Sequence, residues 1–270
     1  MTIGLSHSAS TVHSRSQSCR LPDSSQLAVL GEEKPSEEKT DVIKSMIRRA
    51  PNCESVEDIV ETLSAYPLEA LERVADYGTK LEVYDGQAGE EIPNYMPTLT
   101  QKMVVGAYNT AANVLGAMSH NLSPFVILHE FAHALDASLG EVSEESNWKG
   151  GHKLARNTNQ VVRDYAKMNP SEYFAENTSA YLVSSDANYQ LVSEGLEKGV
   201  ALNGMSEREY IRTHQNYSKN RLQSVDPNGF HLVEEMFESI DSRPMMKSKP
   251  AMNEEQFARW LEEREARAAS

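Results

Sequence analysis

The segment from Ser123 to Gly140 constrains this chain more than any other, because it carries the start, the stop and the periodicity of an α-helix. Ser123 is a favourable N-cap, Pro124 fits the first helical position, and Gly140 can close the carboxyl end. Apolar residues recur along it at helical spacing, namely Phe125, Leu128, Ala132, Leu135 and Leu139. We therefore expect a rigid helix that is anchored in a core.

Within this helix, His129, Glu130 and His133 form the pattern H-E-x-x-H. Residues four positions apart share one face of an α-helix, so the two imidazoles can bind one ion. Glu130 is then the natural general base for a water activated by zinc. Asp136, one turn beyond His133, is either a partner of a histidine or an acid on the helix surface. An ordinary amphipathic helix is the alternative, but the apolar surroundings of the motif disfavour it.

A third zinc ligand is expected from a second helix, which begins near Asn169 and Pro170. Glu172 and Glu176 lie four residues apart on this helix, so they share a face. We assign Glu172 as the ligand and Glu176 as a partner that orients a histidine. A capping box at Asn169 would also explain Glu172, but it would not explain Glu176.

These motifs together resemble a known family. The stretch from His129 to Asp136, HEFAHALD, is followed by Tyr165 and by the sequence EYFAE, which begins at Glu172. This arrangement is similar to the catalytic domain of anthrax lethal factor and its relatives, among them the clostridial Pro-Pro endopeptidases. The resemblance implies a zinc-dependent endopeptidase that acts on a protein substrate.

Roles follow from the resemblance for the matching positions of this chain. The implied zinc ligands are His129, His133 and Glu172. Glu130 would act as the general base, and Tyr165, seven residues before Glu172, would assist the transition state. The implied cofactor is Zn²⁺.

The fold class we expect is α+β, a mostly helical zincin-type metalloprotease domain with a small β-sheet above the H-E-x-x-H helix. Three segments upstream of that helix have the composition of strands, namely Lys80–Tyr84, Met103–Tyr108 and Val114–Met118. The resemblance implies that the last strand before the metal helix borders the cleft and pairs with the substrate backbone. Core β-structure with no role in binding is an equal alternative.

Between His133 and Tyr165 we expect a loop-rich insertion. Gly150 and Gly151 permit backbone geometries that other residues avoid, which favours a mobile loop at the cleft. Trp148 could line a substrate pocket, although core packing is the more common role of a tryptophan. We expect His152 to be a surface histidine.

Composition narrows the range of partners. A net charge of −14 disfavours generic nucleic-acid binding, because phosphates would be repelled. No apolar run approaches the roughly 20 residues that span a bilayer. The two cysteines, Cys19 and Cys53, lack the spacing of metal ligands. We expect a globular enzyme with a protein substrate, no nucleic acid and no membrane span.

Four regions follow from shifts in composition along the chain. They are a Ser-rich disordered leader at residues 1–39, a helical segment at 40–66, the zincin domain at 67–242, and a linker with an amphipathic helix at 243–270. Apolar spacing predicts helices within these regions over Asp41–Arg49, Ala187–Lys198 and Glu254–Ala268, among others. Because residues 1 to about 28 of the leader are rich in Ser and contain no acid before Asp23, they resemble the export signal of a bacterial effector, although an organelle transit peptide has a similar composition. We hypothesise secretion by a bacterium into the cytoplasm of a host cell, where a host protein would be the substrate.

Two other functions are consistent with the same motifs. A non-catalytic effector could use zinc to hold its fold and bind a host protein, but structural zinc sites usually fill four protein positions, often with Cys. A metallohydrolase that acts on a small molecule is the second alternative. A closed pocket would favour the small molecule, and a shallow groove bordered by a strand would favour a peptide.

Overall fold

Four short strands form one sheet, in the order β1-β2-β4-β3. The strands are β1 (Ile47–Arg49), β2 (Lys80–Tyr84), β3 (Gly106–Asn109) and β4 (Val114–Met118). The computed structural model describes residues 35–85, 92–100, 106–119, 123–185, 188, 192, 206–214 and 217–268. β2 runs parallel to β1 and β4, whereas β3 is antiparallel to β4 and forms an edge. The bounds of β2 and β4 confirm the prediction, and residues 103–105 of the strand predicted over Met103–Tyr108 lie outside the described residues.

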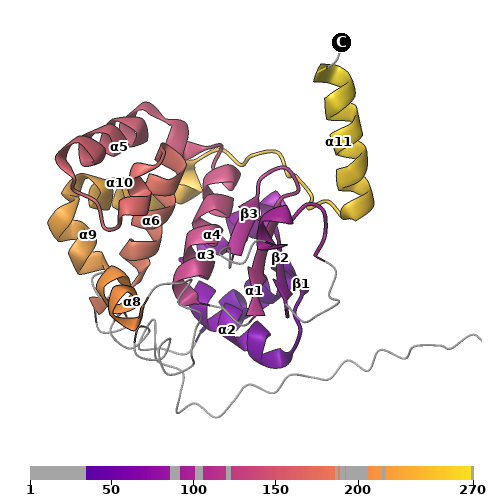
Figure 1. Cartoon of the computed structure of the whole chain (residues 1–270), viewed down its shortest axis with the longest axis horizontal. Helices are drawn as coiled ribbons and strands as arrows, with labels where there is room; N and C mark the ends of the chain where they lie inside the picture. The colour runs from indigo at the N-terminus through magenta and orange to yellow at the C-terminus, as the bar shows by residue number, and fades with distance from the viewer. Residues whose placement is uncertain are drawn as a thin grey trace, which may run out of the picture.

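Helices make up most of the described chain, which confirms the α+β class with a small sheet. They are α1 (Glu37–Met46), α2 (Cys53–Leu63), α3 (Leu68–Tyr77), α4 (Pro124–Ser138), α5 (Ser146–Thr158), α6 (Pro170–Leu182), α8 (Glu207–His214), α9 (Lys219–Val225), α10 (Pro227–Glu238) and α11 (Glu254–Ala268). In Figure 1, α4 lies between the sheet and α6. None of the helices in the described ranges is long and apolar enough to cross a membrane.

Side chains of β2 and β4 are buried on both faces of the sheet. On one face, Leu81, Val83 and Leu115 join the main helical core. On the other face, Tyr84 and Met118 form a second cluster with side chains of the segment at 92–99 and of α11. Two covered faces explain why β4, with the sequence VLGAM, is a continuous apolar run rather than an alternating pattern.

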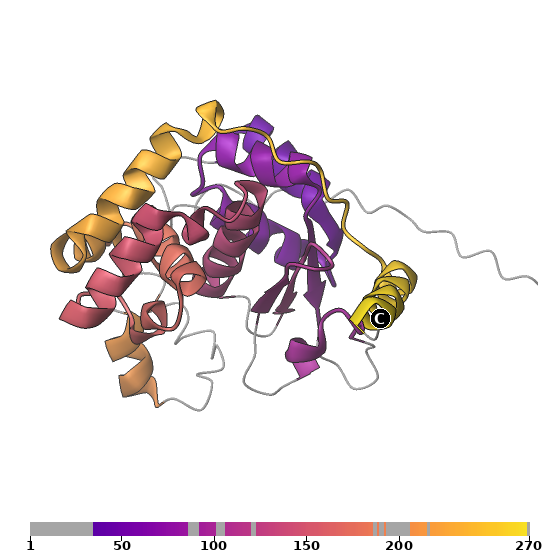
Figure 2. The same cartoon turned by 90° about the horizontal axis from the view of Figure 1, so that it is seen from above.

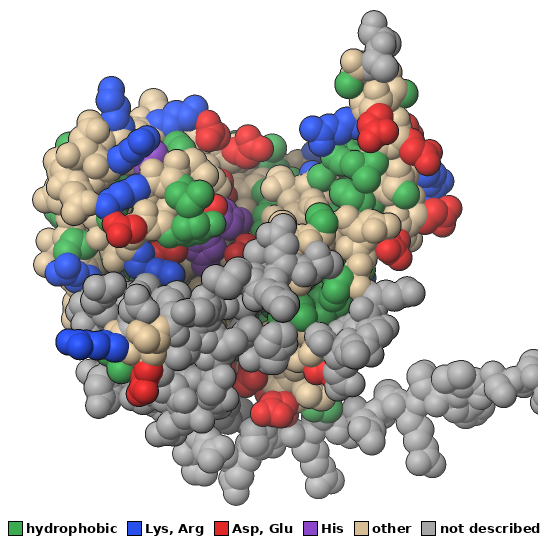
Figure 3. All heavy atoms as spheres, in the orientation of Figure 1, with side chains coloured by type: hydrophobic (Ala, Val, Ile, Leu, Met, Phe, Trp, Pro, Cys, Tyr) green, Lys and Arg blue, Asp and Glu red, His purple; other side chains and the backbone are tan. Residues whose placement is uncertain are grey.

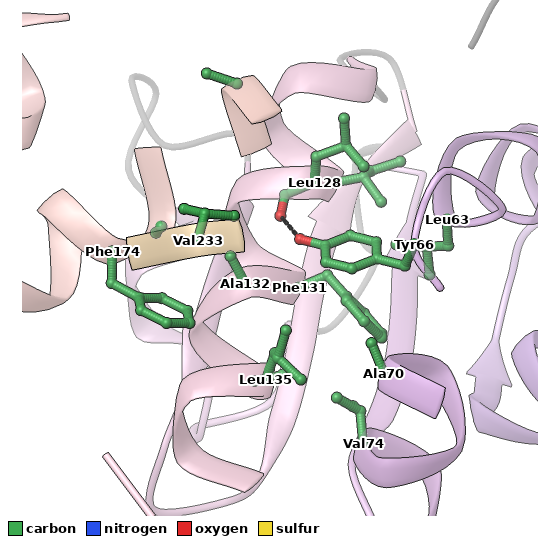
Figure 4. Packing of buried hydrophobic residues seen from close by; sticks show 14 of the residues in the cluster. Leu63, Tyr66, Ala70, Val74, Leu128, Phe131, Ala132, Leu135, Phe174 and Val233 are labelled. Carbon is green, nitrogen blue, oxygen red and sulfur yellow. Dashed lines mark hydrogen bonds between the residues drawn. The ribbon is translucent and has the colours of Figure 1, made fainter. Parts of the chain in front are cut away.

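α4 is held in the core from both sides. Tyr66 packs on Phe131 with ring centroids 4.7 Å apart, and its hydroxyl donates a hydrogen bond of 2.7 Å to the Leu128 carbonyl (Figure 4). On the opposite side Ala132 faces Phe174 of α6 (Figure 4). The helix ends at Ser138, and Gly140, just beyond the cap residue Leu139, has the left-handed φ of +84° that a glycine at this place favours. This packing confirms the prediction that the helix is anchored in the core.

The expected mobile loop between His133 and Tyr165 is wrong, because residues Ser146–Thr158 form α5. Trp148 is fully buried, with its ring centroid 4.7 Å from that of Phe174, so it is a core residue. His152 is buried as well and contacts the Lys167 carbonyl at 3.2 Å, so the expectation of a surface histidine is also wrong. Gly151 has a packing role, since a Cβ at this position would lie 2.7 Å from the Asn228 side chain on α10.

The segment at 40–66 shares its core with the metal helix. Ile43 and Met46 of α1 and Leu63 of α2 belong to the same buried cluster as α4. The helix predicted over Asp41–Arg49 ends at Met46, because the last three residues pair with β2 as a strand. Residues 37–66 are therefore part of the body that carries α4.

The C-terminal segment crosses the body before it reaches α11. The Lys249 N–H donates to the Tyr77 carbonyl at 2.7 Å, and the Met252 N–H donates to the Ala112 carbonyl at 2.9 Å. α11 matches its predicted bounds and docks within the molecule through the buried Phe257, on the side of the sheet away from α5 and α6 (Figure 2). The predicted leader lies outside the described residues up to residue 34, as does nearly all of the helix expected at 187–198. The expected end of the leader at residue 39 is wrong, because residues 37–39 form the first turn of α1.

Candidate metal centre

The side chains of His129, His133 and Glu172 meet at one point between α4 and α6. Each offers a ligand atom, and these three atoms lie within 4.8 Å of one another. His129 Nε2 is 3.0 Å and His133 Nε2 is 3.3 Å from Glu172 Oε2, while the two imidazole nitrogens are 3.2 Å apart. Two helices therefore bring together the three ligands that the sequence suggested.

The start of α6 determines where Glu172 lies. The Asn169 side chain accepts a hydrogen bond of 2.9 Å from the Glu172 N–H, which is the N-cap expected from the sequence. The Glu172 carboxylate is free of that cap and reaches the two histidines instead. The cap and the ligand position are thus compatible, because the cap uses the backbone of Glu172 and the ligand contact uses its side chain.

Two further contacts hold the histidine rings. Glu176 Oε1 lies 3.2 Å from His129 Nδ1, the place at which a partner that orients this ring was expected. Ser171 Oγ lies 3.1 Å from His133 Nδ1, a contact that the sequence analysis missed. Hydrogen bonds to the second nitrogen of a ligand histidine set its tautomer and its orientation. The position of Ser171 next to Glu172 was the only available signal for this role.

Two carboxyl groups at the site have pKa values below the usual value of a glutamate. Burial raises the pKa of the Glu172 carboxyl, but its hydrogen bonds with His129 and His133 outweigh burial and lower that pKa to about 2. Burial also raises the pKa of the Glu176 carboxyl, and the Arg163 guanidinium together with His129 holds it below its usual value. Both carboxylates are therefore ionised at neutral pH. Ionised oxygen is the form in which a carboxylate binds zinc.

Glu130 points from α4 toward the edge strand β3. The Tyr108 N–H donates a hydrogen bond of 2.8 Å to Glu130 Oε2, which orients the carboxylate. Gly106 lets β3 lie this close, since a Cβ there would come within 2.4 Å of Val126 Cγ1 on α4. The strand that borders the cleft is thus β3. The expectation that the last strand before the metal helix has this position is wrong, because β4 lies inside the sheet between β2 and β3.

Tyr165 lies at the opening of the site, on a 3₁₀ turn at Asp164–Lys167. Its side chain is 45% exposed, and its ring centroid is 5.7 Å from that of His129. Burial, followed by the negative charges of Glu172 and Glu130, raises the pKa of the Tyr165 phenol to about 12. The hydroxyl therefore keeps its proton at neutral pH and can donate a hydrogen bond.

Asp136 faces the turn that follows α4. Its carboxylate accepts hydrogen bonds from the Ser143 N–H at 2.8 Å and from the Ser143 hydroxyl at 2.6 Å. Asp136 is buried, so it is not an acid on the helix surface. Both of its carboxylate oxygens bond Ser143, so it stabilises this turn rather than orienting a histidine. Ser171, not Asp136, contacts the Nδ1 atom of His133.

An open cleft of about 580 Å³ runs past these side chains. Gly106, Ala107 and Tyr108 of β3 line it on one side, and Tyr165 and Glu172 line it on the other. Figure 3 shows histidine side chains in a hollow near the middle of this face of the molecule. The cleft has the shape of a groove bordered by a strand and is not an enclosed pocket.

The donor set fits zinc of the catalytic type. Two imidazoles and one carboxylate are the ligands of many catalytic zinc sites, where a fourth position stays open for water or substrate. Structural zinc sites usually take four protein ligands, and the described residues bring three together here. The open cleft beside the three ligands supports the same distinction.

Comparisons with known proteins show similarity at the level of structure. No family model matches this chain, and no curated protein matches it. Among solved structures, the chain is similar to the Pro-Pro endopeptidase PPEP-2 from Paenibacillus alvei, with 17% identity and a TM-score of 0.48. The alignment covers 72% of this chain and 98% of that one.

Proposed function

We propose that this protein is a zinc-dependent endopeptidase that hydrolyses a peptide bond in a protein substrate. The observation that carries the proposal is the convergence of His129, His133 and Glu172 in an open cleft, with Glu130 next to His129 on the same helix. A ligand set of this kind beside a carboxylate that is not itself a ligand is suited to hydrolysis.

Different residues of this chain would bind the metal and transfer the proton. His129, His133 and Glu172 would hold a zinc ion, which would act as a Lewis acid on the scissile carbonyl and would lower the pKa of a water molecule. Glu130 accepts the proton of the attacking water and passes it to the leaving amine. The hydrogen bond from the Tyr108 N–H keeps the Glu130 carboxylate directed into the cleft during both transfers.

A peptide substrate fits the cleft as an additional strand. Among the described residues, β3 pairs only with β4 and forms an edge of the sheet, and three of its four residues line the cleft. An extended peptide can pair with such an edge through main-chain hydrogen bonds. The open groove supports a peptide over a small molecule, for which an enclosed pocket would be expected.

Tyr165→Phe tests the role of the phenol. Because Tyr165 would donate a hydrogen bond to the oxyanion as it forms, its loss is expected to lower kcat by roughly a hundredfold or more and to leave KM little changed. Steady-state kinetics on a cleaved peptide measure this, together with zinc content, which should equal that of the wild type. An unchanged kcat would remove Tyr165 from the mechanism.

The proposal as a whole is tested by metal analysis of the purified protein together with cleavage of a broad peptide library. One zinc ion per chain and cleavage within the library are expected, and both should disappear in the presence of a strong chelator. A protein that binds zinc but cleaves no peptide in the library or in host extracts would contradict the proposal and favour a binding protein.

We further propose that the protease is a bacterial effector that acts on a host protein. The support is compositional: residues 1 to about 28 are rich in Ser and contain no acid before Asp23. Deleting residues 1–30 is expected to abolish export and to leave proteolysis in vitro intact, as measured by immunoblots of the secreted fraction and by peptide cleavage. Loss of proteolysis together with export would contradict a role for this segment in export alone.

A further inference from the structure

Arg163 lies beside the most deeply buried carboxylate of the site. Glu176 is 1% exposed, and its Oε1 atom is 3.2 Å from His129 Nδ1 and 3.6 Å from an Arg163 guanidinium nitrogen. The Arg163 guanidinium also packs over the Tyr217 ring, 5.2 Å from its centroid, and the Tyr217 hydroxyl donates to the Glu176 carbonyl. One buried acid is thus shared between a metal ligand and an arginine.

This arrangement has a physical reason. An ionised carboxylate inside a protein is costly unless a positive charge lies close to it. Arg163 supplies that positive charge next to Glu176. Its planar guanidinium can contact both the carboxylate and the aromatic face of Tyr217. Without this charge, the Glu176 carboxylate would be a weaker partner for His129.

Arg163 also has a second connection to the site through the backbone. It is the N-cap of the 3₁₀ turn at Asp164–Lys167, and Tyr165 stands two residues later. The contact with Glu176 therefore ties this turn to α6, the helix that carries Glu172. The ion pair fixes two parts of the site at once, because the same arginine holds the partner of His129 and the turn that bears Tyr165.

We propose that Arg163 is a positioning residue, which acts through Glu176 to hold the ligand His129 and to keep the Tyr165 turn in place. The inference rests on the proposed zinc site and adds a residue that no motif in the sequence marks. It assigns to Arg163 no contact with metal or substrate.

Zinc affinity provides a test that is independent of catalysis. Arg163→Gln is expected to weaken zinc binding by about 10- to 100-fold, the usual effect of losing a residue that supports a ligand, and Glu176→Gln should do the same. Competition with a chromophoric chelator measures the dissociation constants. Arg156→Gln is the matched control, since it removes the same charge from an exposed position on α5 and should leave the affinity unchanged.

A double-mutant cycle separates action through Glu176 from a general loss of structure. If Arg163 acts through Glu176, the variant with both Arg163→Gln and Glu176→Gln binds zinc about as well as Glu176→Gln alone. A further tenfold loss in the double variant would overturn the proposal. This variant holds no unpaired buried carboxylate at the site, so it carries the test even if Arg163→Gln alone fails to fold.

The remaining outcomes distinguish this inference from the proposed function. Arg163→Lys, which keeps the charge, is expected to stay closer to the wild-type affinity than Arg163→Gln, and peptide cleavage should show a fall in kcat for Arg163→Gln. Wild-type affinity in Arg163→Gln would overturn the inference and leave the protease proposal standing. Zinc binding that depends on Arg163, in a protein that cleaves no peptide, would support the inference and contradict the protease. A folded wild type that binds no zinc would overturn both.

Discussion

Glu130→Gln is expected to lower kcat/KM for peptide cleavage by about 10²- to 10⁴-fold, the range that a general base contributes, while zinc stays bound. Glu130 is not among the three converging ligands, and its carboxylate accepts a hydrogen bond from the Tyr108 N–H. The amide oxygen of Gln can keep that hydrogen bond, but the amide cannot take a proton from water at neutral pH. Chemistry should therefore be lost without loss of the site.

The measurement for Glu130→Gln is kcat/KM on a peptide that the wild type cleaves, with zinc content determined on the same preparation. Glu141→Gln is the control, because Glu141 is an exposed acid that lines the same cleft and is not among the three converging ligands of the described residues. Wild-type proteolysis by Glu130→Gln would remove Glu130 from the mechanism. Loss of zinc would show instead that Glu130 supports the metal site.

Glu172→Ala is expected to abolish tight zinc binding and, with it, peptide cleavage. The variant loses one of the three ligands and leaves the histidines without the carboxylate that lies 3.0 Å and 3.3 Å from their Nε2 atoms. Zinc that binds only the folded state stabilises it by about 2.7 kcal/mol when free zinc is 100 times its dissociation constant. The wild type should gain this stability on addition of zinc, and the variant should gain almost none.

Elemental analysis after dialysis and thermal unfolding with and without zinc measure these effects. Glu144→Ala is the matched control, since Glu144 lines the same cleft but pairs with Lys149 at the surface. Full zinc occupancy in Glu172→Ala would show that the third ligand lies elsewhere. The N-cap of α6 uses the Asn169 side chain and the backbone of residue 172, so the substitution should leave the helix itself intact.

Local signals account for the parts of the structure that the sequence predicted well. The α4 helix, β2, β4 and α11 have the expected positions, since caps, periodicity and composition act within a few residues of each other. The same spacing rule put His129 and His133 on one face of α4, and Glu172 and Glu176 on one face of α6. Helical geometry alone determines these pairs.

Other features depended on contacts between distant segments. α5 was mistaken for a mobile loop because a Gly-Gly pair weakens helix propensity, and burial of Trp148 against α6 outweighs that cost. The place of β3 at the sheet edge could not be predicted either. Strand order is set by which side chains of each strand are buried against which helix, and that information is spread over the whole chain.

The sequence by itself determined the chemical identity of the proposed site: two histidines and a glutamate with ligand spacing, a general base between the histidines, and a tyrosine at a fixed distance from the third ligand. The tertiary structure decided which residues support them. Ser171 beside His133 and Arg163 beside Glu176 stand in no motif, because a supporting contact needs only proximity and a complementary charge. Proximity between α4, α6 and the turn at Asp164–Lys167 exists only once the core between them has packed.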